Sequence, residues 1–279
     1  MRSKVISIAN RKGGVYKTTV TQHLAIALGA CGARVLVIDL DYTQASLTKS
    51  IKGSLMGTPQ KGVMHLFLDK QTLPSEVIVK TKYSGVDIIG SEEMVMGRKI
   101  VIEDIIQSEL GKNEILREFL ENIRDQYDFI LIDTPPALGS MTINAMTASK
   151  YCLIPTTADD MSTDGLCSLF DELIEVRKRL NKEIEPLGIL LVGVNGREKI
   201  AKQKRKALKD AWGDIVFKTE VKINVKFKSL LEGQQSIFDV IQTPSEKGAL
   251  EYFDLATEII QKTKNNQTTR MNESTQEAL

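Results

Sequence analysis

Six short runs of consecutive apolar residues recur along the chain and predict buried strands. The runs cover residues 5–9, 35–40, 86–90, 129–133, 151–155 and 189–194. They are continuous rather than alternating, which is typical of strands that are covered on both faces of a sheet. Segments of helical periodicity lie between them, most clearly over residues 112–126, 168–181 and 245–262. The pattern predicts an α/β fold with a doubly wound, mostly parallel sheet flanked by helices.

The chain shows no internal repeat and no linker that would divide this pattern. We therefore expect residues 1–262 to form one domain. The remaining residues, 263–279, read TKNNQTTRMNESTQEAL and have little apolar surface to bury. Such composition favours a polar, disordered tail.

Composition narrows the classes of protein further. The chain has 279 residues and is 42% hydrophobic, which is enough for a sizeable core. Cys31, Cys152 and Cys167 lie far apart, which argues against structural zinc or a disulfide framework, and the two histidines have no metal-binding spacing. Charge interrupts the first residues too early for a signal peptide, and no run approaches the roughly 20 apolar residues of a membrane span. We expect a cytoplasmic protein.

The first apolar run leads into RKGGVYKTT, residues 11–19, and then into a helical segment. In a strand, glycine loop and helix of this kind, backbone amides and the helix N-terminus face phosphate oxygens. The lysine contacts the outer phosphates, and the first hydroxyl residue holds magnesium. The sequence therefore predicts a site for ATP and Mg²⁺, formed by Lys12, Gly13, Gly14, Val15, Tyr16, Lys17, Thr18 and Thr19, with Thr18 as a metal ligand.

Two positions depart from the ordinary phosphate-binding loop, G-x-x-x-x-G-K-S/T. Arg11 and Tyr16 stand where that loop has glycines. Residues 12–18 instead satisfy the pattern K-G-G-x-x-K-S/T. We expect positive φ at Tyr16, which costs a residue with a Cβ about 1–2 kcal/mol, and a ring that leaves the phosphate channel. The sequence thus predicts a working site with weakened ATP binding, slow hydrolysis or altered dimerisation.

With this loop, the segment VLVIDLD at 35–41 and the segment YDFILIDTPP at 127–136, the chain resembles the ParA family of partition ATPases. That family lies within a wider group that includes MinD and the nitrogenase iron protein. The resemblance implies that Lys12 reaches the nucleotide of a dimer partner and that Asp41 orients or activates the attacking water. It also implies that Asp133 holds magnesium through water and that Asn195 contacts adenine. Asp39 is a further candidate metal ligand, although it could instead cap a loop, and Asn195 could be a turn former.

Positive charge is concentrated between residues 197 and 228, the basic segment, which contains eleven Lys and Arg residues and only four Asp and Glu residues. Such clustering suits contact with DNA phosphates independently of base sequence, although it could also be a solvated helix face. ParA-like proteins bind DNA non-specifically through basic residues in their C-terminal part. The candidate DNA-binding residues are Lys199, Lys202, Lys204, Arg205, Lys206, Lys222, Lys226 and Lys228, with the last two as first choices.

The resemblance implies an ATPase that forms a homodimer with ATP bound and binds DNA on the nucleoid. A ParB-type partner protein stimulates hydrolysis, and the dimer then releases the DNA. The alternative is an ATP-responsive DNA-binding regulator with little or no hydrolysis. A MinD-like protein would end in a basic amphipathic membrane helix, but this tail has no apolar stripe, so no membrane partner is expected. The three cysteines do not match those that share an iron–sulfur cluster in a nitrogenase-type reductase.

Overall fold

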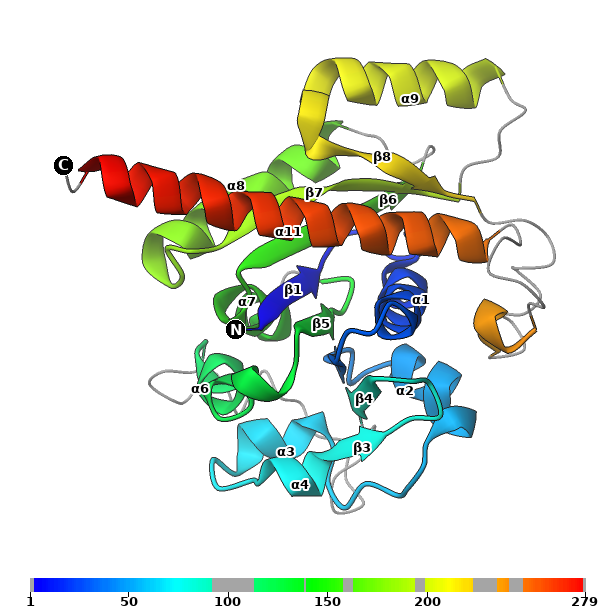
Figure 1. The fold of residues 1–279 in the computed structure, drawn as a ribbon, viewed down its shortest axis with the longest axis vertical. Helices are drawn as coiled ribbons and strands as arrows, with labels where there is room; N and C mark the ends of the chain where they lie inside the picture. The colour runs from blue at the N-terminus through cyan, green and yellow to red at the C-terminus, as the bar shows by residue number, and fades with distance from the viewer. Residues whose placement is uncertain are drawn as a thin grey trace.

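The computed structural model describes residues 3–91, 113–137, 139–157, 163–193, 199–222, 235–240 and 248–277. Its centre is an eight-stranded sheet in the order β3-β4-β2-β5-β1-β6-β7-β8 (Figure 1). The strands are β1 (Lys4–Ile8), β2 (Val35–Asp39), β3 (Ile78–Lys80), β4 (Val86–Ile89), β5 (Phe129–Asp133), β6 (Tyr151–Thr157), β7 (Glu185–Val192) and β8 (Val216–Val221). All neighbours pair in parallel except β3 and β4. The predicted fold class is confirmed.

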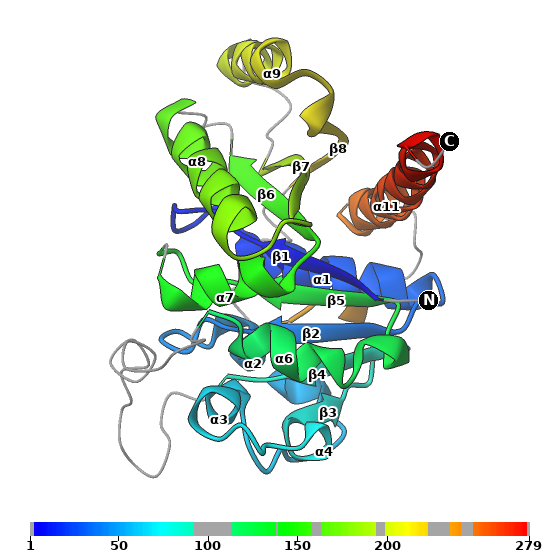
Figure 2. The same ribbon diagram turned by 90° about the vertical axis from the view of Figure 1, so that its left-hand side faces the viewer.

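Helices cover both faces of the sheet, as the continuous apolar runs require (Figure 2). One layer contains α1 (Lys17–Ala30) and α11 (Ala249–Glu277); the other contains α6 (Ile115–Glu121), α7 (Ser140–Ala148) and α8 (Thr163–Arg179). The described helices also include α2 (Ser46–Ile51), α3 (Val63–Leu68), α4 (Pro74–Val77) and α9 (Lys199–Trp212). Short 3₁₀ turns occur at η1 (Lys52–Ser54), η2 (Arg124–Gln126), η4 (Gly213–Ile215) and η5 (Ile237–Asp239).

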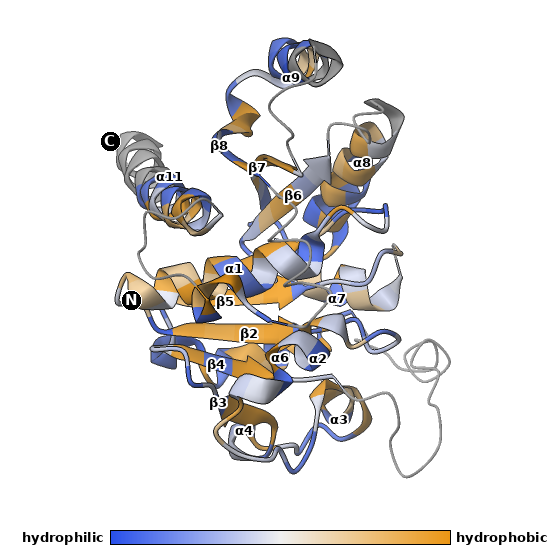
Figure 3. Ribbon diagram, turned by 90° about the vertical axis from the view of Figure 1, so that its right-hand side faces the viewer, coloured by the Kyte–Doolittle hydropathy of each residue, from blue (hydrophilic) through white to orange (hydrophobic). Residues whose placement is uncertain are grey.

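Alternate residues of each central strand enter opposite core layers. In β2, Val35 and Val37 pack into the cluster that contains α1 and α11, whereas Leu36 and Ile38 pack into the cluster that contains α6 and α7. Figure 3 shows the resulting hydrophobic central strands and the hydrophilic residues along α9. Burial on both faces explains why the strand sequences are apolar without alternation.

Several boundaries differ from the sequence expectation. β3 and β8 were not expected because both are short edge strands with charged or half-exposed positions, and α6 ends at Glu121, before the 3₁₀ turn η2. The last helix does not end at residue 262. Thr263 is buried and donates a hydrogen bond to the carbonyl of Ile259, and the helical backbone continues to Glu277 across the segment that was expected to be a disordered tail.

In the described part of the chain, no helix combines the length and the apolarity that crossing a membrane requires.

Candidate nucleotide-binding site

The sheet order brings the predicted site residues together at its carboxyl edge. β5 lies between β1 and β2, and in the β-ladder Asp133 pairs with Ile8 on one side and with Asp39 on the other. The glycine loop that follows β1 therefore lies beside the carboxylates that end β2 and β5. Ligands of open α/β sheets bind at such an edge.

A pocket of about 380 Å³ opens at this edge, within the size range of small-molecule sites. Predicted residues that line it are Gly13, Gly14, Tyr16, Lys17, Thr18, Thr19 and Asp41. Residues that the sequence did not single out complete the lining: Gln22, Gln44, Ser46, Ser50, Thr134 and Pro136. Val15 is fully buried under the loop, and Lys12 is exposed outside the pocket lining.

Asn10 anchors the start of the glycine loop, a role that sequence reasoning missed. Its Oδ1 accepts a hydrogen bond from the backbone N–H of Lys12 (3.0 Å), and its Nδ2 donates to the carbonyl of Pro155 in β6 (2.7 Å). The Arg11 guanidinium donates to the hydroxyl of Ser168 in α8. The polar Asn10 directly after the predicted strand 5–9 was the sequence feature that could have indicated this role. Together these contacts fix the loop against β6 and α8.

Lys17 begins α1 and is buried with 7% of its surface exposed. Its Nζ lies 3.4 Å from the carbonyl of Lys12, so the side chain folds back over its own loop. Burial lowers the pKa of the ammonium, while Asp133 and Asp41 act in the opposite direction. The loop thus presents a desolvated cation, which suits phosphate oxygens.

Thr18 lines the pocket and is hydrogen-bonded to the fully buried Asp133. The Thr18 hydroxyl donates to Asp133 Oδ2 (2.7 Å), and the Thr21 hydroxyl lies 3.4 Å from Oδ1. Burial, and then the neighbouring Asp39, raise the pKa of Asp133 to about 8. A nearby divalent cation would offset the cost of ionising this carboxyl, and the donating Thr18 hydroxyl keeps lone pairs for a metal. These residues fit a magnesium site.

The described residues contain no group of three or more His, Cys, Asp or Glu side chains that could hold a metal without other ligands. This agrees with the preference of Mg²⁺ for one or two protein ligands, several waters and substrate phosphate oxygens.

Asp39 and Asp41 have different surroundings although they are two residues apart. Asp39 is fully buried, and its oxygens accept from the Asp41 N–H (3.1 Å) and from the N–H and hydroxyl of Thr48 (2.9 and 2.7 Å). Burial raises its pKa to about 6. Asp39 therefore links β2 to α2, which supports the capping interpretation.

Asp41 lines the pocket. Its Oδ1 accepts from the hydroxyl of Thr43 (2.7 Å) and the N–H of Gln44 (3.2 Å). Two donors on one oxygen fix the plane of the carboxylate. The group is held where it could face a ligand in the pocket.

Tyr16 has the left-handed backbone conformation expected at its position, with φ 64° and ψ 27°. Its ring packs over Gly193 at the end of β7, where a Cβ added to the glycine would lie 3.2 Å from Tyr16 Cε2. Thr157, the last residue of β6, borders the same spot. The ring thus extends from the loop towards β6 and β7, while Tyr16 still lines the pocket.

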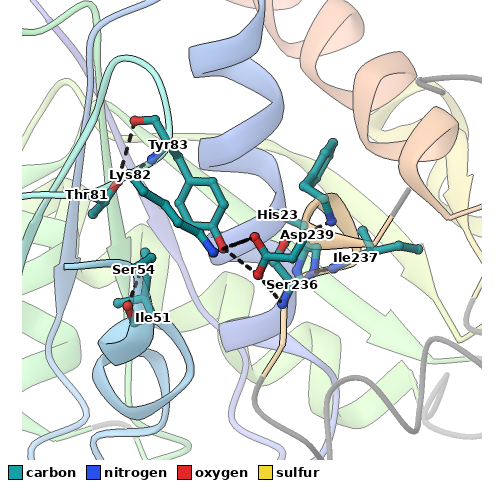
Figure 4. A network of polar contacts seen from close by, with 10 residues as sticks. His23, Ile51, Ser54, Thr81, Lys82, Tyr83, Ser236, Ile237 and Asp239 are labelled. Carbon is teal, nitrogen blue, oxygen red and sulfur yellow. Dashed lines mark hydrogen bonds and ion pairs between the residues drawn. The ribbon is translucent and has the colours of Figure 1, made fainter. Parts of the chain in front are cut away.

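His23 has a structural place on α1 (Figure 4). Its Nδ1 lies 2.8 Å from the carbonyl of Thr19, and its Nε2 accepts from the N–H of Ile237 (3.2 Å). Asp239, in the same 3₁₀ turn, accepts from the Tyr83 hydroxyl (3.0 Å) and pairs with Lys82 (2.8 Å). The helix that starts in the glycine loop is therefore tied to η5, which follows the basic part of the chain.

Those expected DNA-binding residues that the structure describes belong to α9 or directly follow β8, the strand at one edge of the sheet (Figure 1). Lys206 and Lys222 are exposed there, and Lys199, Lys202 and Lys204 belong to α9. Arg205 differs from the expectation, because its guanidinium pairs with Glu220 (2.9 Å) and both side chains are less than one-fifth exposed. Arg205 therefore joins α9 to β8. Asn195, Lys226 and Lys228 lie outside the described residues.

The family model for the AAA domain matches residues 3–186. The sporulation initiation inhibitor protein Soj of Bacillus subtilis is 32% identical over 256 residues, covering 92% of this chain and 98% of Soj. The chromosome partitioning protein ParA of Caulobacter vibrioides is 30% identical over 266 residues, covering 95% of this chain and 96% of ParA.

A crystal structure of cobyrinic acid a,c-diamide synthase from Mycobacterium smegmatis with bound ADP and magnesium matches with a TM-score of 0.77. It is 24% identical and covers 95% of this chain and 96% of the other, a likeness that establishes the fold alone. The sequence relatives go further, since each is at least 30% identical and covers more than nine-tenths of the chain. The chain belongs to the ParA/Soj family of P-loop ATPases.

Proposed function

We propose that this protein is an ATP-dependent partition ATPase that binds ATP and Mg²⁺ in the pocket beside the glycine loop. The observation that carries the proposal is the hydrogen bond from Thr18 to Asp133, directly beside the buried ammonium of Lys17. The names of the Soj and ParA relatives support a role in DNA partition. The protein would act in the cytoplasm, on the nucleoid.

Within this site, the α1 N-terminus and Lys17 bind the phosphates, and Thr18 holds Mg²⁺ together with Asp133, the latter through water. Mg²⁺ supplies positive charge to the phosphate oxygens when it is bound. Asp39 is not among the ligands that we propose, because Thr48 and the backbone already occupy its oxygens.

Asp41 is the residue that we propose to position the attacking water. It is 5% exposed and lines the pocket, and Thr43 and Gln44 fix its orientation. A positioned base of this kind contributes about 10²- to 10⁴-fold to a rate.

ATP binding would also build a homodimer. Lys12 is exposed beside the loop and outside the lining of its own pocket, which suits contact with the nucleotide of a partner subunit. Asn195 would contact adenine.

The dimer would hold DNA through the basic segment, with Lys206, Lys222, Lys226 and Lys228 as the main contacts and Lys199, Lys202 and Lys204 beside them on α9. Contact with phosphates alone would make this binding independent of base sequence. A ParB-type partner protein would stimulate hydrolysis and so release the DNA.

Two variants test the nucleotide site. Lys17→Ala should abolish ATP binding in calorimetry with magnesium, because no neutral side chain replaces an ammonium between phosphate oxygens. Asp41→Ala should retain ATP binding and lose phosphate release. Unchanged affinity in the first variant, or normal turnover in the second, would show that these roles are wrong.

Tyr16 favours a second candidate, an ATP-responsive DNA-binding regulator that hydrolyses little or no ATP. The left-handed position that is glycine in the ordinary phosphate-binding loop holds a tyrosine here, and this tyrosine lines the pocket. Steady-state hydrolysis with and without DNA and the partner protein distinguishes the two. Stimulation supports partition, and a rate that stays at background supports the regulator.

A further inference from the structure

A second pocket, of about 430 Å³, lies at the amino edge of the sheet, opposite the edge that carries the glycine loop. It is bordered by the start of β1, by α6 and η2, by the end of α7 and by the connection between α8 and β7. It shares no lining residue with the nucleotide pocket. A ligand here would bind independently of the proposed ATPase site.

The lining of this pocket is rich in positive charge. Two carboxylates, Glu121 and Glu183, accompany five cations: Lys4, Arg117, Arg124, Lys150 and Lys182. The arginines are partly neutralised, since Arg117 pairs with Glu114 and Arg124 pairs with Glu121 (3.1 Å). The positive excess is therefore carried by the three lysines, which come from three separate segments of the chain.

Lys4 and Lys150 are brought together by the neighbouring strands β1 and β6. Their ammonium groups lie over the rings of Phe129 (4.9 Å) and Tyr151 (5.3 Å). Burial lowers the pKa of Lys4, and the positive charges of Lys264 and Lys150 lower it further, while Asp128 opposes them. A buried cation with other positive charges near it favours an anion beside it.

Two hydroxyls at the same pocket lack hydrogen-bond partners among the described residues. Ser3 and Thr147 are 8% and 1% exposed, and their side-chain oxygens are buried and unsatisfied. Buried polar groups in proteins are nearly always hydrogen-bonded, and exceptions call for a specific explanation. Within the described part of the chain, Ser3 and Thr147 are therefore hydrogen-bond donors without acceptors, at a pocket of positive charge.

We propose that this pocket binds a small phosphorylated molecule. Lys4 and Lys150 would hold the phosphate, and Ser3 and Thr147 would donate hydrogen bonds to its oxygens. A phosphate matches this set better than a carboxylate does, because it offers more charge and more acceptor oxygens to several donors at once. The pocket volume is that of a small-molecule site, which favours a metabolite over a duplex backbone.

The test is calorimetric titration of the full-length Lys17→Ala chain with inorganic pyrophosphate, because that background removes phosphate binding at the glycine loop. One saturable site per chain is expected. Adding Lys4→Gln and Lys150→Gln should weaken its affinity at least tenfold. Thr147→Val should weaken it several-fold, and Thr147→Ser should restore it. Lys178→Gln, an exposed lysine of α8 outside the pocket, is the matched control and should bind as the background chain does.

Absence of saturable binding at millimolar pyrophosphate, or equal affinity in the Lys4 and Lys150 variant and the Lys178 control, would overturn the proposal. Thermal melting of every variant checks the fold. If the double lysine variant fails to fold, the pair Thr147→Val and Thr147→Ser decides the question. Wild-type chain should show a second pyrophosphate site. If it shows only the site that Lys17→Ala retains, the proposed nucleotide site fails and this proposal stands.

Discussion

Tyr16 shows how a loop can keep its conformation while losing the residue type that normally allows it. The backbone is left-handed at Tyr16, where a Cβ costs about 1–2 kcal/mol relative to glycine. Gly193 supplies the space for the ring, since a Cβ there would crowd it at 3.2 Å. The local cost is tolerated because the ring packs against the core cluster that includes α1.

Replacing Tyr16 by glycine should raise ATP affinity or turnover several-fold, with the fold intact. A tyrosine that leaves the left-handed conformation when no nucleotide is bound must regain that strain on binding. The cost corresponds to about one order of magnitude in affinity, and glycine removes it. Tyr16→Ala is the matched control, because it keeps the Cβ and removes only the ring. Calorimetry and phosphate release measure both variants. If Tyr16→Gly lowers affinity and turnover together, the tyrosine contributes positively to the mechanism.

At the scale of single residues, the sequence predicts what a local motif specifies. Lys17 and Thr18 follow from the glycine loop, and Asp133 follows from the resemblance of its segment to the ParA family. The structure places all three at one site. Asn10 and Gln22 were missed because their contacts arise only when distant elements meet: Asn10 reaches Pro155, and Gln22 borders a pocket shared with α2. The spacing of residues in the sequence does not predict contacts between elements that are distant along the chain.

At the scale of elements, His23 connects α1 to η5 as a neutral ring. The Thr19 carbonyl accepts a hydrogen bond from the Nδ1–H, and the Ile237 N–H donates to Nε2, which must be unprotonated to accept it. Burial lowers the pKa of His23 from 6.5 to about 4, although Asp239 acts in the opposite direction. Tyr252 of α11 stacks on the ring at 5.1 Å. The link is therefore intact only while the ring is neutral.

This pKa shift predicts a loss of stability in mild acid. The unfolded chain binds the His23 proton near pH 6.5 and the folded chain only near pH 4, so the contribution is present above pH 6.5 and is lost as the pH falls towards 4. Between pH 7 and pH 5 the loss is about 2 kcal/mol. His23→Gln keeps an acceptor near Ile237 without a titrating ring. Urea unfolding at both pH values should show a smaller pH effect in the variant, and equal effects would contradict the link.

For the basic segment, DNA binding should strengthen with ATP, ignore base sequence and weaken steeply with salt. Lys226→Glu with Lys228→Glu should weaken it without changing ATP affinity, and each lost phosphate contact should reduce the salt slope by about 1. Fluorescence anisotropy over a salt series measures both. Equal binding by the double variant would direct attention to Lys206 and the rest of α9.

Arg205→Gln is the control variant for this DNA-binding experiment. Because Arg205 pairs with the mostly buried Glu220, its loss should lower the melting temperature and leave the salt slope of DNA binding unchanged. A reduced slope in this variant would return Arg205 to the DNA-binding residues.

At the scale of the whole molecule, continuous apolar runs were sufficient to predict a doubly wound sheet, because burial on both faces leaves a direct mark on strand composition. The order of the strands in the sheet could not be predicted in this way, because strand composition does not specify which strands are neighbours. It is the order β2-β5-β1 that places Asp133 between the glycine loop and Asp39. The edge strands β3 and β8 were missed for the opposite reason, since partial exposure gives them mixed sequences.

The exposed position of Lys12, outside its own pocket, predicts that two inactive variants restore each other. In a two-fold dimer each site would contain Asp41 from one subunit and Lys12 from the other. Lys12→Ala and Asp41→Ala should each lack hydrolysis alone. In their mixed dimer, the site in the Lys12→Ala subunit has its own Asp41 and receives Lys12 from its partner, so that site is complete. Random pairing makes about half of the dimers mixed, with one complete site of two, so the equimolar mixture should recover about a quarter of wild-type hydrolysis. A mixture as inactive as its components would show that Lys12 does not act across a dimer interface.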